Sequence, residues 1–355
     1  MWPRTDLLEL LGITHPIIQA PMSGFSSPAL VAAVSNAGAL GSLGCATLAT
    51  QTARDHVEQI RRASNRPFNL NFFVHPAPHI DVNVAHRMRA RLSRYYDEFD
   101  VGSVPEPSVP FPHFDDKRLQ LILDVRPRVV SFHFGLPPAD TLKRIKQTGA
   151  VVLSSATTVA EARKLQAEGA DGIIAQGFEA GGHRGTFTEG DGAGLIGTMA
   201  LVPQVADAVR VPVIAAGGIA DGRGIAAAFA LGASGVQIGT AFLGCPEAAV
   251  PAIHRDALHR AADEDTRLTR AFTGRPARAL RNRLIDEMGD SEVLEFPAQI
   301  SLMRPLFQAD SDTARAAFLP LWAGQAAPLV RDLSAAEFID TLVVEARQRL
   351  PNSQP

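Results

Sequence analysis

The sequence predicts an α/β fold: a (β/α)8 TIM barrel with a smaller, mostly helical domain inserted after the eighth strand. Short apolar runs, each followed by a glycine or polar turn and then a helical pattern, recur eight times between residues 17 and 240. After residue 245 this rhythm stops and charged helical patterns extend to about residue 322. A doubly wound sheet is the alternative, but PMSGFSS follows the first run where that fold carries GxGxxG.

The eight expected strands are short runs bounded by small or polar residues. They lie at 17–20, 40–43, 68–74, 129–132, 151–154, 172–175, 213–215 and 235–238. Helices are expected at 27–36, 50–63, 158–168, 199–209, 221–231 and 335–350, and a glycine-rich loop at 186–198. We expect a barrel domain at 1–246, completed by 323–350, and a helical substrate-covering domain at 247–322.

A long connection follows the third run. It contains a helical pattern near 84–96 and a proline-rich stretch at 104–114, VPEPSVPFPHF. Connections of this length in compact domains are usually lids, binding loops or disordered segments. Within the third run, Asn69 and Asn71 stand two residues apart and therefore point to one side of the strand. Such side chains need partners, because burying one unpaired costs about 1–3 kcal/mol.

Composition and charge exclude several classes of protein. A net charge of −3, without Lys/Arg clusters between aromatic residues, argues against nucleic acid as a partner. Arg4, Asp6 and Glu9 interrupt the first apolar run, so we expect neither a secretory leader nor a membrane span, and a cytoplasmic location. Cys45 and Cys245 form no CxxC pair. Neither a disulfide framework nor a cysteine-based zinc site is therefore expected. A metal enzyme is not expected either, because Pro-Ala-Pro between His75 and His79 keeps the two histidines off one helix face.

The ends of the seventh and eighth runs favour a phosphate site. Active sites of such barrels lie at the carboxyl ends of the strands, and the last two loops commonly bind phosphate through backbone N–H groups. Gly217 and Gly218 end the seventh run, and Gly239 and Thr240 end the eighth. These residues offer no side chain that would block an anion, and one hydroxyl that can bind it.

The sixth run opens into a loop, GGHRG, that carries His183 between glycines. Glycines cost folding entropy, so three of them indicate backbone that passes close to another group. The alternative is a flexible surface loop with an incidental histidine. Asn71 and Gln176 can each donate and accept hydrogen bonds, which suits the rim of a flat heterocycle such as an isoalloxazine. Ordinary hydrogen bonding within the barrel is the alternative for both amides.

Three long motifs together resemble the nitronate monooxygenase family, formerly called 2-nitropropane dioxygenases. They are PIIQAPMSG at 16–24, GADGIIAQGFEAGGHRG at 169–185 and VPVIAAGGIADGRGIAAAFALGASGVQIGTAFL at 211–243. VVSFHFG at 129–135 and FTGRPARALRN at 272–282 fit the same family. The resemblance implies a tightly bound FMN. Its implied contacts are Met22, Asn71, Gln176, Gly181, Gly217, Gly218, Gln237, Ile238, Gly239 and Thr240.

The resemblance also implies the reaction, in which O2 and FMN convert an alkyl nitronate into a carbonyl compound and nitrite. His183 would be the catalytic histidine, either holding the anion by a charge-assisted hydrogen bond or taking a proton from a neutral nitroalkane. Some relatives line the substrate pocket with tyrosines. This chain has only Tyr95 and Tyr96, adjacent in an expected helix, so Phe111, His113 and His133 are candidates instead. For His133 the alternative is a satisfied histidine at a strand end.

Other functions stay open at this point. An FMN-dependent NAD(P)H:quinone or enoyl-thioester reductase of the same barrel type also carries a GGH loop. Arg184 after the histidine favours the nitronate branch mildly. A non-catalytic flavin-binding module would leave the GGHRG loop without a purpose. The oligomeric state is open, with a homodimer among the alternatives.

Overall fold

A computed structural model describes residues 2–188 and 194–350 of the chain. Eight parallel strands form its main sheet: β1 (Ile17–Gln19), β2 (Gly41–Gly44), β3 (Phe68–Phe73), β4 (Val129–His133), β5 (Val151–Ala156), β6 (Gly172–Gln176), β8 (Val213–Ala216) and β9 (Gly235–Ile238). The order is β1-β9-β8-β6-β5-β4-β3-β2. Leu40 closes the ring between β1 and β2, because its N–H donates to Ile17 O (3.0 Å) and its carbonyl accepts from Gln19 N–H (2.9 Å). The predicted barrel is confirmed.

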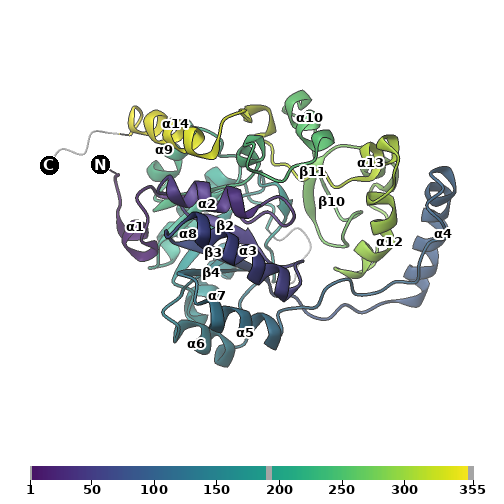
Figure 1. Ribbon diagram of the computed structural model, residues 1–355, viewed down its shortest axis with the longest axis horizontal. Coiled ribbons are helices and arrows are strands. Elements are labelled where there is room, and N and C mark those ends of the chain that lie inside the picture. Colours follow the sequence, from purple (N-terminus) through teal and green to yellow (C-terminus); the bar gives the residue numbers. More distant parts are fainter. Residues whose placement is uncertain (1, 189–193, 351–355) are drawn as a thin grey trace.

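Helices surround the barrel, as Figure 1 shows. They are α2 (Pro28–Asn36), α3 (Thr50–Ala63), α5 (Asp116–Val125), α6 (Ala139–Lys146), α7 (Val159–Glu168), α8 (Thr198–Ala208), α9 (Gly222–Ala230) and α14 (Ala335–Arg347). Ser27, Thr158 and Asp221 cap three of them by accepting backbone N–H groups. The last helix, α14, packs against α9 and α2, so the end of the chain supplies the helix that follows the eighth barrel strand.

The barrel interior is filled from two directions. Helix α1 (Asp6–Leu11) brings the fully buried Leu7 and Leu11 against Ile174 and Ile214. On the β2–β4 side, Asn69 Nδ2 donates to Ser42 Oγ (3.1 Å) and Ser131 Oγ (2.8 Å), and Asn71 Nδ2 also donates to Ser131 Oγ (2.9 Å). The two asparagines of the third run therefore join neighbouring strands.

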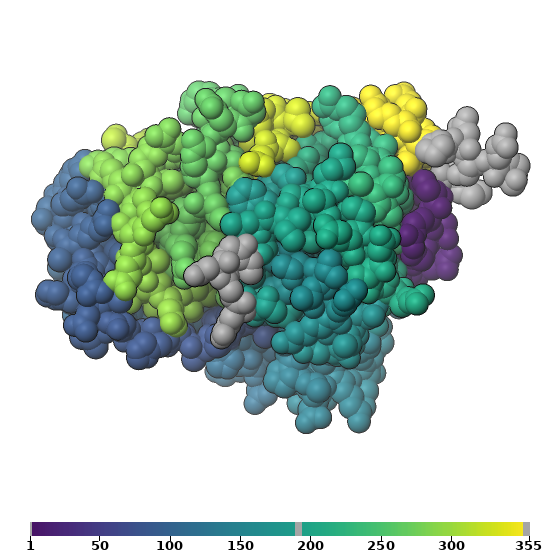
Figure 2. All heavy atoms as spheres, turned by 180° about the vertical axis from the view of Figure 1, so that it is seen from behind, coloured from purple at the N-terminus to yellow at the C-terminus, as the bar shows by residue number. Residues whose placement is uncertain are grey.

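A second lobe is built from two separate parts of the chain. Its elements are α4 (Val82–Glu98), α10 (Ala252–Arg260), β10 (Thr266–Thr269), β11 (Ala277–Leu280), α11 (Arg283–Met288), α12 (Ala298–Phe307) and α13 (Asp312–Phe318). Helix α4 leaves the barrel after β3 and shares a core with the 271–318 segment. Figures 1 and 2 show this helix, in blue, against the green elements of the lobe. Tyr95 and Tyr96 are both buried there, and Tyr96 Oη donates to Leu302 O (2.6 Å).

The lobe contains a three-stranded sheet that the sequence did not predict, ordered β10-β11-β7. The charged helical pattern expected between residues 245 and 322 is wrong at residues 277–280, which form β11. Arg278 looks like part of a charged helix face, but it is buried and donates to Phe178 O (3.1 Å) and Thr266 Oγ1 (3.1 Å). The third strand, β7 (Gly182–His183), comes from the loop after β6 and pairs antiparallel with β11.

Two further expectations concern single segments. Residues 189–193, in the middle of the expected glycine-rich loop, lie outside the described part of the chain. Across residues 2–188 and 194–350, we find no helix with both the length and the apolar character that crossing a bilayer requires.

Candidate active site

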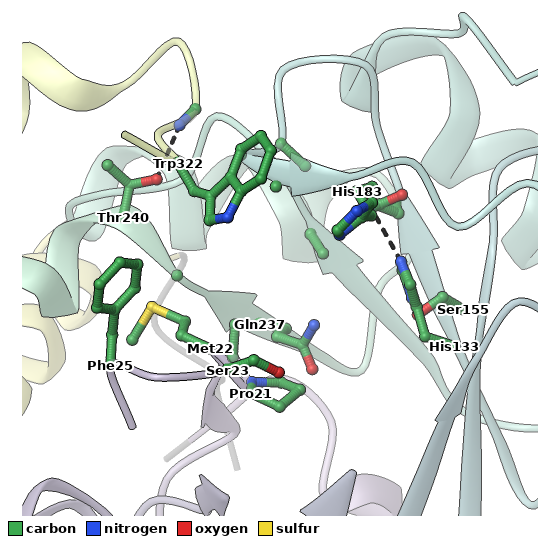
Figure 3. A pocket seen from close by; sticks show the side chains of 18 of the residues that line it. Pro21, Met22, Ser23, Phe25, His133, Ser155, His183, Gln237, Thr240 and Trp322 are labelled. Carbon is green, nitrogen blue, oxygen red and sulfur yellow. Dashed lines mark hydrogen bonds between the residues drawn. The ribbon is translucent and has the colours of Figure 1, made fainter. Parts of the chain in front are cut away.

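A cavity of about 350 Å³ lies between the carboxyl ends of the barrel strands and the second lobe (Figure 3). Its size falls within the range of about 300–1,000 Å³ that is typical of ligand sites. Residues at or just after each of the eight barrel strands line its floor. The second lobe and its connections contribute the roof, which consists mainly of Phe111, Thr273, Phe296, Ile300, Phe307 and Trp322. The cavity is therefore where a barrel enzyme carries its active site.

Most of the residues expected at the site meet in this cavity. Its lining includes Met22, Asn71, Phe111, His133, Gln176, Gly181, His183, Gly217, Gly218, Gln237, Gly239 and Thr240. Ile238 does not line it, because alternate residues of a strand face opposite sides and Gln237 faces inward. The Ile238 side chain instead packs in the core between strands and outer helices. His113 is also absent from the lining.

The loop that carries His183 is held from the barrel side by hydrogen bonds. Gln176 Nε2 donates to His183 O (2.9 Å), and Gln176 Oε1 accepts from Gly185 N–H (2.7 Å). The buried Arg184 guanidinium donates to the carbonyls of Gln176 (2.9 Å), Gly177 (2.5 Å) and Gly194. Arg184 therefore fixes the loop backbone and points away from the ligand space, a structural role that its place in the motif did not reveal.

Two glycines of this loop are explained by close approach. A Cβ at Gly185 would lie 2.9 Å from His133 Cε1, and a Cβ at Gly181 would lie 2.6 Å from backbone atoms of Ala323 and Gly324. Both separations are too short for a side chain to fit. The GGHRG pattern thus marks backbone wedged between the barrel and the 323–324 segment, in place of a flexible surface loop.

His133 and His183 stand side by side in Figure 3, in different bonding situations. His133 Nε2 donates to His183 O (3.1 Å), so its Nδ1 accepts from Ser155 Oγ (3.0 Å). Both His133 nitrogens are occupied, which matches the alternative of a satisfied histidine. His183 uses only Nε2 in hydrogen bonds between described residues, with Thr273 Oγ1 at 3.0 Å. His183 therefore has Nδ1 available for a ligand.

The protonation state of both histidines follows from their surroundings. Burial, with a smaller contribution from the Arg275 guanidinium, lowers the pKa of His133 and of His183 to about 3. Aromatic rings enclose His183, with the centroids of Phe296 and Trp322 at 5.3 Å and 5.5 Å. Without an anionic ligand, both imidazoles are neutral at neutral pH.

These depressed pKa values predict acid sensitivity of the fold. Burial also lowers the pKa of His254, to about 4. Below pH 6.5 the unfolded chain binds more protons than the folded chain, so the unfolding free energy should fall as pH drops from 6.5 toward 4. The slope should approach about 1.4 kcal/mol per pH unit for each such histidine. Urea denaturation at pH 7.5, 6 and 5 measures it. His254→Leu should flatten the slope, and a constant unfolding free energy over this range would refute the assignment.

The residues expected to bind phosphate lie at the end of the cavity away from His183. Gly217 and Gly218 have φ values of 108° and 72°, which favour glycine. A Cβ at Gly217 would lie 3.0 Å from Ala180 N, so a side chain would fill the hollow between these segments. Thr240 Oγ1 accepts from Gly324 N–H (2.9 Å) and opens the 3-10 helix η1 (Thr240–Gly244). Glu179 lies beside this end, and its carboxylate accepts from Thr198 N–H and Thr198 Oγ.

Gln237 leaves one hydrogen-bonding position in the cavity unused. Its Oε1 is buried and has no hydrogen-bond partner among the described residues, although the side chain faces the cavity. A buried acceptor without a partner is costly. A ligand N–H in the cavity would remove that cost, and an isoalloxazine rim carries such a donor. The described residues contain no group of three or more His, Cys, Asp or Glu placed to hold a metal ion.

A closed parallel barrel, with a ligand cavity at its carboxyl edge and a histidine facing that cavity, defines the class of (β/α)8 barrel enzymes. The model of the family described as "Nitronate monooxygenase" matches residues 4–345. This chain belongs to the nitronate monooxygenase family.

Relatives and solved structures agree with this placement. The chain is 43% identical to nitronate monooxygenase of Pseudomonas aeruginosa over 96% of this chain and 98% of the relative. It is 41% identical to nitronate monooxygenase of Paraburkholderia phytofirmans over 98% and 96%. The structure of nitroalkane oxidase from Streptomyces ansochromogenes superposes with a TM-score of 0.88, at 39% identity, over 97% of this chain and 99% of that one. FabK from Thermotoga maritima superposes with a TM-score of 0.75 at 29% identity, over 98% and 97%.

The sequence missed most of the roof. Phe296, Ile300, Phe307 and Trp322 are isolated apolar residues within helical or irregular segments, and nothing in their spacing separates them from core residues. Thr273 lies inside the FTGRPARALRN motif, which marked the family without indicating a role for this hydroxyl. The one available signal was that this family motif lies outside the barrel, after its last strand, where a purely structural segment would be expected.

Proposed function

We propose that this protein oxidises alkyl nitronates with O2 to a carbonyl compound and nitrite, using FMN held in the cavity. One observation carries the proposal: His183 faces a ligand cavity, with Nδ1 available, in a chain 43% identical to nitronate monooxygenase of Pseudomonas aeruginosa. The loop that presents this imidazole is fixed on both sides, so the residue is positioned for chemistry rather than for packing.

The residues of the cavity fit FMN. Gly217, Gly218, Gly239 and Thr240 would hold the phosphate through exposed backbone and one hydroxyl. Gln237 Oε1 would accept from the heterocycle, together with the other contacts expected at Met22, Asn71, Gln176 and Gly181. Ile238 could contribute only its backbone. When bound, FMN supplies the electron acceptor for the oxidation.

His183 would act as a base. The Thr273 hydroxyl proton can be donated to Arg275 O (3.3 Å). We therefore assign His183 the tautomer in which Nε2 donates to Thr273 Oγ1 (3.0 Å) and Nδ1 carries the lone pair. A neutral imidazole with a free lone pair can take a proton from the carbon beside a nitro group, which gives the nitronate. To hold a nitronate bound as an anion, His183 would have to carry a proton on Nδ1 as well, and the negative charge of the ligand would favour that protonated form.

This site implies a different role for each lobe. Residues 1–246 with 323–350 would form the FMN-binding barrel, and 247–322 the domain that covers the substrate. Helix α4, although it precedes β4 in the chain, packs with the covering domain and would stabilise it.

Anaerobic stopped-flow spectroscopy of the FMN-loaded protein tests the function. The flavin absorbance should change on mixing with ethyl nitronate and stay that of oxidised FMN on mixing with NADH or NADPH. Rapid bleaching by a pyridine nucleotide, with no response to the nitronate, would move the chain to the reductase alternative. A protein that takes up no FMN would refute both.

A further inference from the structure

Helix α8 begins outside the cavity, next to the glycine pair that follows β8. Thr198 is its first residue and is buried, and the Thr198 hydroxyl lies 2.9 Å from Gly217 O and 3.4 Å from Ala216 O. Gly217 and Gly218 line the cavity, whereas Thr198 does not. The Gly217 carbonyl, directed at Thr198, therefore points out of the cavity.

The orientation of this carbonyl fixes the orientation of the next N–H group. A trans peptide group is planar, and its C=O and N–H bonds point in opposite directions. With Gly217 O directed at Thr198, the N–H of Gly218 is directed into the cavity. Among the described residues, no backbone carbonyl accepts this N–H. It is therefore a donor that the fold leaves for a ligand.

The Thr198 side chain is held in place from two sides. A Cβ at Gly177 would lie 1.9 Å from Thr198 Oγ1, and a Cβ at Gly217 would lie 3.1 Å from the same atom. Both oxygens of Glu179 accept the Thr198 N–H, at 2.9 Å and 2.8 Å. Gly197, at the N-cap position of α8, has no side chain, so Glu179 supplies the cap from the loop after β6. Thr198 is therefore fixed between the loops that follow β6 and β8.

The Thr198 hydroxyl has one proton and two close acceptors, Gly217 O at 2.9 Å and Glu179 Oε2 at 2.8 Å. Glu179 is also the one carboxylate in the cavity lining formed by the described residues, and no Lys or Arg side chain belongs to that lining. A phosphate here would be held by backbone N–H groups and the Thr240 hydroxyl instead of by a cation. Its binding would therefore depend on the direction of each N–H group.

We propose that Thr198 is a positioning residue for the phosphate of FMN: its hydroxyl holds the Gly217 carbonyl outward and thereby aims the Gly218 N–H at the phosphate. This inference rests on the proposed function, since it concerns the cofactor of the same site. Thr198 itself touches neither the flavin nor the substrate. Its hydroxyl should therefore affect a flavin that carries the phosphate and should not affect riboflavin, which lacks it.

The test compares the affinities of the full-length apoprotein for FMN and for riboflavin, which share one heterocycle and differ by the phosphate. Fluorescence titration gives both dissociation constants, and the ratio of the riboflavin constant to the FMN constant isolates the phosphate. Thr198→Val keeps the shape of the side chain and removes the hydroxyl. It should lower this ratio about tenfold, as for one hydrogen bond to a charged group, and leave riboflavin affinity unchanged. Thr198→Ser keeps the hydroxyl and should restore the parent ratio.

Thr158→Val is the matched control. Thr158 caps α7, where its Oγ1 accepts from Glu161 N–H (3.1 Å), and it does not belong to the cavity lining. This variant loses a hydrogen bond at the start of a helix, as Thr198→Val does. It should be less stable than the parent protein and keep the parent ratio of the two dissociation constants.

Glu179→Gln gives an independent result, which also serves if Thr198→Val does not fold. The glutamine amide can donate to Thr198 Oγ1, so that the hydroxyl proton is left for Gly217 O. The same change removes a negative charge from the phosphate end of the cavity. Both effects favour the phosphate, so the ratio should rise severalfold.

The failures of the two proposals are distinguishable. An unchanged ratio in Thr198→Val would overturn the role of Thr198 and leave the proposed function intact, whether both affinities stay the same or fall equally. A Glu179→Gln ratio at or below the parent value would do the same, and so would equal affinities of the parent protein for the two flavins. If the parent protein binds neither flavin, the proposed function fails, and the inference fails with it.

Discussion

His183→Ala is expected to lower nitroalkane and nitronate turnover by about 10²–10⁴-fold while FMN stays bound. The imidazole is the candidate base that faces the cavity beneath the roof, and alanine leaves no base at that position. The loss should be larger for a neutral nitroalkane, which needs its proton removed, than for a preformed nitronate. Retention of FMN is expected because the phosphate residues lie at the other end of the cavity.

Steady-state O2 uptake and the flavin absorbance of the purified variant measure both effects. His86→Ala is the matched control, because His86 is exposed on α4 and lies away from the cavity. Activity of His183→Ala within about threefold of the parent enzyme would remove His183 from the chemistry, since that is far below the contribution of a general base.

Gly218→Leu is expected to cost the cofactor. Gly218 has φ 72°, and a Cβ there would point at the Glu179 side chain, 3.3 Å from its Cβ. The remaining atoms of leucine would occupy the space assigned to the phosphate. We expect FMN binding to weaken at least about a hundredfold, which corresponds to about 3 kcal/mol. Titration of the apoprotein with FMN, followed by flavin fluorescence, measures the change.

Gly149→Leu separates this effect from backbone strain. Gly149 has φ 85°, so leucine there costs similar conformational energy, but no atom lies within 4 Å of the Cβ position. The control should lose stability and keep its FMN affinity. If Gly218→Leu binds FMN as tightly as the control does, the phosphate site is elsewhere.

The parts of the fold that repeat were predictable from the sequence. Each barrel unit consists of a short apolar run and a helix, and its signal lies within about thirty residues, so the eight strands were found to within a few positions. The residues at the strand ends followed from the barrel itself, because parallel strands bring their carboxyl ends to one edge. His183, Gly217 and Thr240 could be brought together in this way without any knowledge of contacts.

The second lobe could not be predicted in the same way. Its sheet pairs residues 182–183 with 277–278, almost a hundred positions away, and neither segment is long or apolar enough to show as a strand. The sequence of helix α4 does not show that it packs on α12, because its apolar face could equally well pack against the barrel. Charged composition predicted a helix where Arg278 is buried in β11.

His183 belongs to both halves of the molecule. Gln176 and His133 hold its carbonyl from the barrel, while Thr273 holds its ring and β11 pairs with its backbone from the other side. Arg184, the next residue, donates its N–H to Pro276 O (2.9 Å) and its guanidinium to the barrel loop. A rigid displacement of one half against the other must break one of these two sets of bonds. The position of the His183 imidazole therefore depends on both halves of the molecule, and it is kept only while the barrel and the second lobe stay in contact around this residue.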